Sequence, residues 1–301
     1  MTGWTTADMP AQHGRIAVVT GANSGLGLVT ATELARHGAR VVLAVRNTAA
    51  GAEAARRIGG DVEVRELDLA SLASVRAFAA GLAADHPAVD LLVNNAGVVL
   101  LGPRRSTADG FELQLGTNLL GHFALTGLLL GTLAAAPAPR VVNLSSITHK
   151  TAHLDFDDLM FERGYRASAA YGRSKLATTV FGVELDRRLR AAGSPIVSAL
   201  AHPGLTRTNL TPRAWEHRGR LGRVIARAGL LATQPVERGA LPQLRAATDP
   251  GVRGGEFFGP AGLFETRGRV TEARLSREAA DPVVGRRLWA AAEELTGVSF
   301  L

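Results

Sequence analysis

The chain has 301 residues, of which 46% are hydrophobic and 20% are charged, and it carries a formal net charge of +7. These values are ordinary for a globular protein and leave enough apolar residues to build a large core. The absence of cysteine excludes disulfides and thiolate zinc sites, and it is compatible with the cytoplasmic location that we expect. The N-terminus lacks a basic start followed by an apolar run, so we expect no signal peptide.

Short apolar runs rich in β-branched residues alternate with helical patterns along the chain. The predicted strands are 15–20, 39–46, 62–69, 89–97, 140–146, 195–204 and 256–260. Helical patterns lie between them, with long ones at 111–136 and 169–192 and a final one at 281–295. Nearly continuous apolar strands that alternate with helices are typical of a parallel sheet covered on both faces. We therefore predict an α/β fold with a doubly wound, Rossmann-type parallel sheet.

The chain shows no internal repeat and no linker, so we expect one domain over 1–301. Within it we expect a cofactor-binding core at 14–204 and a substrate-covering segment at 205–301. The apolar stretch 119–136 is interrupted by glycine, histidine and threonine, which favours a buried helix over a transmembrane span. Six arginines and one acid lie within 203–230 with no interleaved aromatic residue except Trp215, so we expect a solvated helix and no nucleic-acid partner.

A glycine-rich turn joins the first predicted strand to the helix that follows it. The turn consists of Gly21, Ala22, Asn23, Ser24, Gly25, Leu26 and Gly27. Glycines let the backbone approach a phosphate, and the N-terminus of a helix supplies N–H donors and a positive dipole. Parallel α/β sheets bind dinucleotides at this first strand–helix junction. We predict a dinucleotide site here, and a tight turn that binds no ligand is the alternative.

The ends of the next two strands carry polar residues that bear on the cofactor. The second strand ends in Arg46, whose guanidinium suits the 2′-phosphate of NADP, whereas an acid there would suit the 2′-hydroxyl of NAD. An ordinary surface arginine is the alternative. Asp68 ends the third strand, where it can reach the edge of an adenine ring or cap the following helix.

A tyrosine and a lysine lie four residues apart on the predicted helix 169–192. The chain has two tyrosines and two lysines in total, and Tyr171 and Lys175 share one helical face. A nearby ammonium lowers the pKa of a phenol, which prepares it for acid–base chemistry at neutral pH. Ser146 ends a strand, where its hydroxyl can polarise a substrate oxygen. For residues taken singly, the alternatives are an ordinary surface Tyr–Lys pair and a serine that caps a helix or lies in a turn.

With these residues together, the chain resembles the short-chain dehydrogenase/reductase family. The matching stretches, in family order, are TGANSGLG at 20–27, Asp68 with Leu69, NNAG at 94–97, Asn118, Ser145 with Ser146, YGRSK at 171–175 and PGLTRT at 203–208. The resemblance spans about residues 14–210. TGANSGLG, VVLAVRN at the second strand and the wide gap between Ser146 and Tyr171 are most similar to the retinol dehydrogenase-like branch. The residues in this gap are expected to form a loop over the site.

The resemblance implies a role for each matched residue. Ser146, rather than Ser145, is implied as the catalytic serine and Tyr171 as the acid/base. Lys175 would lower the pKa of the tyrosine and hold the nicotinamide ribose, and Asn118 would support a water relay to the lysine. The further implied cofactor contacts are Asn95, Ala96 and Gly97 near the adenosine and Pro203 and Thr208 near the nicotinamide. From the residues alone, Asn118 is equally compatible with a structural asparagine.

We therefore expect an oxidoreductase that transfers a hydride between NADP(H) and a carbonyl or alcohol carbon, with NAD(H) as the alternative cofactor. Apolar residues among the arginines of 205–235 suggest a largely apolar small-molecule substrate. One alternative is a catalytically silent nucleotide-binding regulatory protein. Another is a C=C reductase of the protochlorophyllide reductase type, which the lack of a cysteine proton donor disfavours. A homodimer or homotetramer that packs through helices 111–136 and 169–192 is compatible with the sequence.

Overall fold

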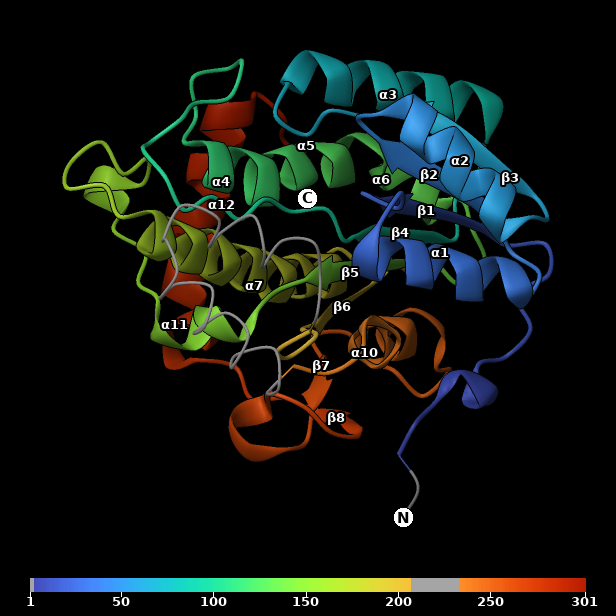
Figure 1. The fold of residues 1–301 in the computed structure, drawn as a ribbon. Coiled ribbons are helices and arrows are strands. Elements are labelled where there is room, and N and C mark those ends of the chain that lie inside the picture. The colour runs from blue at the N-terminus through green and yellow to red at the C-terminus, as the bar shows by residue number, and fades with distance from the viewer. Residues whose placement is uncertain (1–2, 207–232) are drawn as a thin grey trace.

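One twisted sheet forms the centre of the protein (Figure 1), whose computed structural model describes residues 3–206 and 233–301. In the described part, eight strands form this sheet in the order β3-β2-β1-β4-β5-β6-β7-β8. Their bounds are β1 Ile16–Thr20, β2 Arg40–Val45, β3 Val62–Glu66, β4 Leu91–Asn94, β5 Arg140–Leu144, β6 Val197–Ala201, β7 Phe257–Pro260 and β8 Val270–Glu272. The first seven are parallel and β8 is antiparallel to β7. The doubly wound sheet predicted from the sequence is confirmed.

Helices cover both faces of this sheet (Figure 1). Their bounds are α1 Gly25–Arg36, α2 Thr48–Ile58, α3 Leu72–Asp85, α4 Leu113–Leu115, α5 Gly121–Leu128, α6 Leu130–Ala134, α7 Ala167–Ala191, α10 Val236–Thr248, α11 Arg277–Ala280 and α12 Pro282–Thr296. Neighbouring strand residues point to opposite faces, so Val18 packs with α3, α5 and α7 in one core while Val19 packs with α1, α2 and α10 in the other. This double burial explains why the strands are apolar throughout.

The predicted helix 111–136 is not continuous. It consists of α4, a π-helical turn at Gly116–Leu120, α5 and α6, with a break at Leu129, where φ is −95° and ψ is 2°. A π turn contains one more residue than an α turn, and such turns are frequent at functional sites. Here the turn contains Asn118, one of the predicted site residues. No helix in the described ranges is both long enough and apolar enough to cross a bilayer.

The C-terminal helix α12 lies against α5 and α7. Its Trp289 is 2% exposed, and the ring lies 5.1 Å from that of Phe123 and 4.7 Å from that of Phe300. Phe181 of α7 joins the same aromatic cluster. The chain's own helix therefore covers part of the surface that we expected to pack against another subunit. The predicted arginine-rich helix and the apolar residues among its arginines lie outside the described residues.

Trp289→Ala should lower the free energy of unfolding by about 3–5 kcal/mol, because it removes the largest side chain from the cluster that attaches α12. Val283→Ala is the matched control, since Val283 lies on the same helix and is 53% exposed. Urea denaturation of both variants measures the difference. A loss for Trp289→Ala as small as that of the control would contradict the packing described for α12.

Candidate active site

The predicted site residues gather at the carboxyl edge of the sheet. The glycine turn follows β1, Asn95 to Gly97 follow β4, Ser146 follows β5 and Pro203 follows β6. Between β1 and β4 the strand order reverses direction, since β2 and β3 lie on one side and β5 to β8 on the other. Open parallel sheets bind ligands outside the carboxyl ends of strands at such a reversal.

The glycine turn packs closely against the segment after β4. Gly21 and Gly25 have φ values of 65° and 55°, a left-handed conformation that side chains disfavour. A Cβ on Gly27 would lie 2.5 Å from Asn95 Nδ2 and 2.6 Å from the carbonyl oxygen of Gly21. Ser24 is the N-cap residue of α1, and its side chain accepts no bond from the first turn of the helix. The geometry thus presents the N-terminus of α1 at the edge of the sheet without a side-chain cap.

A buried hydrogen-bond chain connects the end of β1 with the π turn. The hydroxyl oxygen of Thr20 accepts from the backbone N–H groups of Asn95 at 3.0 Å and Ala96 at 2.9 Å, and it contacts His122 Nε2 at 2.9 Å. His122 Nδ1 contacts the carbonyl oxygen of Asn118 at 3.1 Å. Because a carbonyl only accepts, Nδ1 carries the proton and Thr20 donates to Nε2.

Burial lowers the pKa of His122 to about 4, against the opposing effect of its bond to Asn118. The ring is therefore neutral at physiological pH and keeps the tautomer that the hydrogen bonds to Thr20 and Asn118 require. Sequence reasoning missed His122. Its only signal was its position four residues after Asn118 in an otherwise apolar stretch.

The side chain of Asn118 joins the segment after β4 to α7. Its Oδ1 accepts from the N–H of Val98 at 2.8 Å, and its Nδ2 donates to Ser174 Oγ at 2.9 Å. Ser174 in turn donates to the carbonyl oxygen of Tyr171 at 2.8 Å. A Cβ on Gly97 would lie 3.2 Å from Asn118 Oδ1 and 3.4 Å from Lys175 Nζ, so both groups border this glycine. These bonds give Asn118 a structural role, which is one of the two roles that the sequence allowed for it.

Tyr171 and Lys175 lie one turn apart in the N-terminal half of α7, and Ser146 follows β5. Burial raises the pKa of Tyr171, and a hydrogen bond between Tyr171 and Ser146 partly offsets this. Lys175 is 5% exposed, its Nζ donates to the carbonyl oxygen of Leu144 at 2.8 Å, and burial lowers its pKa to about 8. We expected the ammonium to lower the pKa of the phenol. In the protein alone, burial raises this pKa, and the opposing contribution comes from Ser146.

Ser145 and Ser146 occupy different environments. Ser145 is buried and its Oγ contacts Thr179 Oγ1 at 2.6 Å beneath α7. Ser146 is partly exposed, and its Oγ accepts a bond from the N–H of Thr148 at 3.3 Å in addition to the bond with Tyr171. Of the two serines, Ser146 therefore has the hydroxyl that lies beside the phenol.

The outer residues of the predicted cofactor site differ in surroundings. Arg46 is exposed at the end of β2 and forms no hydrogen bond or ion pair with any residue of the described ranges. Asp68 is partly exposed, and its Oδ1 accepts from the N–H of Ala70 at 2.9 Å, as in a turn that precedes a helix. The side chain of Leu69 is buried in the core. The carbonyl oxygen of Pro203 accepts from Thr206 and Gln234, and Thr208 lies outside the described residues.

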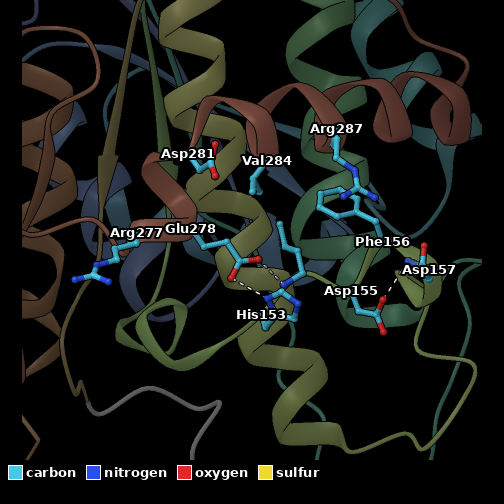
Figure 2. Close-up of a pocket in the computed structure, with 10 residues that line it drawn as sticks. His153, Asp155, Phe156, Asp157, Arg277, Glu278, Asp281, Val284 and Arg287 are labelled. Carbon is cyan, nitrogen blue, oxygen red and sulfur yellow. Dashed lines mark hydrogen bonds and ion pairs between the residues drawn. The ribbon is translucent and has the colours of Figure 1, made fainter.

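A hollow of about 420 Å³ lies elsewhere, between residues 153–157 and the helices α11 and α12 (Figure 2). Figure 2 shows His153 and Glu278 turned toward each other, with His153 Nδ1 and Glu278 Oε2 3.0 Å apart. Arg287 lies over the ring of Phe156 at 4.3 Å. The catalytic candidates do not line this hollow. Part of the segment that we expected to form a loop over the site thus packs against the C-terminal helices instead.

The chain belongs to the short-chain dehydrogenase family, whose sequence profile matches residues 15–219. It is 41% identical to human retinol dehydrogenase 13 over 99% of this chain and 89% of that protein. It is also 41% identical to the polyprenol dehydrogenase of Mus musculus, over 96% of this chain and 86% of that protein. The chain is thus a retinol dehydrogenase-like oxidoreductase that acts on CH–OH or C=O groups.

Solved structures agree with this family. An uncharacterized protein from Mycobacterium paratuberculosis is 45% identical, with a TM-score of 0.84 and complete coverage of both chains. The active-site complex of Pseudomonas aeruginosa RhlG with NADP is 28% identical, with a TM-score of 0.65 over 82% of this chain and 94% of that one. The similarity to the first structure therefore includes the C-terminal elements β7 to α12 as well as the core.

Gly27→Ala should destabilise the protein by about 1–3 kcal/mol, because the added Cβ overlaps a backbone oxygen as well as a side chain. Gly131→Ala is the matched control, since a Cβ on that helical glycine meets nothing within 4 Å. The control should be neutral or stabilising by up to about 1 kcal/mol. Thermal unfolding of the two variants compares them, and equal stabilities would mean that the turn is less closely packed than described.

Proposed function

We propose that the protein transfers a hydride between NADP(H) and a carbonyl or alcohol carbon of a largely apolar substrate, with Tyr171 as the acid/base. The observation that carries this proposal is the grouping of three side chains: the Tyr171 phenol interacts with the Ser146 hydroxyl, and the ammonium of Lys175 is buried one helical turn further along α7. A silent nucleotide-binding protein has no need of this arrangement. The family to which the chain belongs also favours an enzyme.

The residues at the carboxyl edge of the sheet fit a nicotinamide dinucleotide. The glycine turn and the uncapped N-terminus of α1 suit its phosphates, and Arg46, which has no partner among the described residues, suits a 2′-phosphate. Asp68 and the segment Asn95 to Gly97 would border the adenosine, while Lys175 and Pro203 would border the nicotinamide end. When bound, the cofactor supplies or accepts the hydride.

The protein's own groups handle the proton. For carbonyl reduction, the phenol of Tyr171 donates a proton to the substrate oxygen while the Ser146 hydroxyl donates a hydrogen bond to the same oxygen. The raised pKa of Tyr171 keeps this phenol protonated at neutral pH, which suits reduction. For alcohol oxidation the phenol must first lose its proton. The ammonium of Lys175 and the positive charge of the oxidised cofactor would favour the phenolate in that case.

An apolar substrate is supported by side chains near the same edge of the sheet. Leu205, two residues after Pro203, is 40% exposed, and its N–H donates to the carbonyl oxygen of Thr266 at 2.8 Å. Leu263 and Phe264, which precede Thr266 in the loop between β7 and β8, are 78% and 77% exposed. The names of the relatives, which refer to retinol and polyprenol, agree with an apolar substrate class. A screen of aldehydes, ketones and secondary alcohols of graded size, followed by NADPH absorbance, tests the proposal.

Tyr171→Phe should reduce turnover about 100- to 10,000-fold, because it removes the proton donor. The affinity for NADP should stay nearly unchanged, since the hydroxyl acts on the substrate oxygen. Tyr165→Phe is the matched control, because Tyr165 is the only other tyrosine and contacts Glu112 and Gln114 instead of Ser146. Steady-state kinetics and cofactor titration provide both readouts. Turnover close to that of wild type in Tyr171→Phe would refute the assignment.

Arg46→Asp should shift the cofactor preference from NADPH toward NADH. A pair between the guanidinium and a 2′-phosphate is worth about 1.5–3 kcal/mol at an exposed position, or roughly a ten- to hundredfold preference. Arg56→Asp is the control, since Arg56 is an exposed arginine on α2, the helix that follows Arg46. Dissociation constants for both cofactors decide the matter. If the wild type binds NADH as tightly as NADPH, Arg46 is only a surface charge.

A further inference from the structure

The second lysine of the chain also lies close to the candidate site. Lys150 follows Ser146 by four residues, in the 3₁₀ turn Ile147–Thr151. Its Nζ lies 2.6 Å from Oε1 of Glu265, which belongs to the loop between β7 and β8. A residue of the C-terminal part of the chain therefore holds the segment that begins with the candidate catalytic serine.

The other carboxylate oxygen of Glu265 reaches the segment after β6. His202 Nε2 lies 2.9 Å from Oε2 of Glu265, and His202 Nδ1 accepts from the N–H of Gly204 at 3.3 Å. The His202 side chain is fully buried. With Nδ1 as the acceptor, Nε2 carries the proton and donates to the carboxylate. Glu265 thus joins the Ser146–Lys150 segment to the His202–Gly204 segment, which contains Pro203.

The surrounding backbone is shaped for this contact. A Cβ on Gly259 of β7 would lie 2.1 Å from His202 Nε2, so glycine leaves the space that the imidazole occupies. Phe264 and Glu265 have φ values of 52° and 55°, which is unfavourable for residues with side chains. Such conformations persist where the surrounding contacts determine them. The bond from the N–H of Leu205 to the carbonyl oxygen of Thr266, at 2.8 Å, fixes the loop on the same segment.

The charge of Glu265 is maintained by its two partners. Burial alone would raise the pKa of this carboxyl, but the hydrogen bonds from His202 and Lys150 lower it to about 2. His149 extends the arrangement, because its Nδ1 donates to the carbonyl oxygen of Ser146 at 2.7 Å. The rings of His149 and His202 both contact Phe257, at 5.3 and 5.2 Å. The carboxylate of Glu265 therefore accepts from Lys150 in the segment after β5 and from His202 in the segment after β6.

We propose that Glu265 is a positioning residue that holds the Ser146 segment and the Pro203 segment at a fixed separation. The inference rests on the proposed function, in which Ser146 contacts the substrate oxygen and Pro203 borders the nicotinamide. Hydride transfer is sensitive to the distance between the substrate and the nicotinamide, and a misplacement of about 1 Å can cost on the order of 100-fold in rate. Glu265 itself touches neither reactant.

Glu265→Gln tests the proposal, because an amide cannot accept from both donors without placing its NH₂ group against one of them. We expect kcat with NADPH and a carbonyl substrate to fall roughly 10- to 100-fold, as expected for a small misplacement, while the Kd of NADPH changes little. The primary isotope effect with deuterated NADPH should rise as hydride transfer becomes slower. Glu272→Gln, at an exposed position of β8, is the matched control.

Variants of Lys150 separate positioning from simple stability. Lys150→Met should reproduce the loss of kcat, and Lys150→Arg should restore it in large part. Thermal unfolding of each variant shows that the protein is folded. An unchanged kcat and isotope effect in both Glu265→Gln and Lys150→Met would overturn the proposal.

Hydrogen exchange tests the same contact without relying on activity. In Glu265→Gln, the amides of 146–151 and of 204–206 should both exchange faster than in wild type, while those of the β1 to β4 strands keep their rates. Unchanged exchange in the two segments would refute the contact. If the wild type itself reduces no carbonyl compound with either cofactor, the proposed function fails, and the exchange result still decides whether Glu265 joins the two segments.

Discussion

A lysine ammonium buried at the carboxyl edge of the sheet is the constraint on which the site depends. Removing such a charge from water costs several kcal/mol, and the bond from Lys175 Nζ to the carbonyl oxygen of Leu144 offsets only part of this cost. The lowered pKa of about 8 reflects the remainder. Lys175 Nζ and Asn118 Oδ1 both lie next to Gly97, on the side of the backbone where any other residue would have its Cβ. A site that keeps a cation in this position favours a negatively charged or phenolate partner.

The helices and strands around this lysine act as one framework because polar side chains connect them. Thr20 links β1 to the segment after β4, and His122 links Thr20 to the π turn. Asn118 then links the segment after β4 to α7. The neutral His122 fixes the direction of two of these contacts, since its Nδ1 donates to the Asn118 carbonyl and Thr20 donates to its Nε2. A defined arrangement of this kind keeps reacting groups in place, which is the main contribution that a protein makes to hydride chemistry.

Local sequence patterns predicted much of the fold and the candidates Ser146, Tyr171 and Lys175, whereas Asn118, Asn95 to Gly97 and Pro203 were implied by the family resemblance. The alternation of apolar strands and helices determines the doubly wound sheet, and the four-residue spacing of Tyr171 and Lys175 on one helix required no tertiary information. The break in the helix 111–136 and the cover that α12 provides over α5 were not predicted, because both depend on packing between distant segments. The contact of Glu265 with Lys150 and His202 was invisible for the same reason, since these residues are far apart in the sequence.

The sequence predicted the lowering effect of the ammonium on the pKa of Tyr171, but not the burial that raises this pKa in the protein alone. Spacing along a helix shows that two side chains share a face, but the balance of burial and charge depends on which groups surround them. Burial dominates for the phenol, and the ammonium is directed at the Leu144 carbonyl. We therefore expect this pKa to fall in the state with oxidised cofactor bound, in which a second positive charge lies near the phenol.

The most direct test is an ultraviolet titration of Tyr171 in Tyr165→Phe, which leaves it as the only tyrosine. The tyrosinate absorbance is followed against pH with and without oxidised NADP, and again with Lys175→Met added. We expect a pKa above the usual tyrosine value in the protein alone, a clear decrease when oxidised NADP binds, and a smaller decrease without the lysine. A phenol pKa that does not respond to the oxidised cofactor would contradict the assignment of Tyr171 as the acid/base.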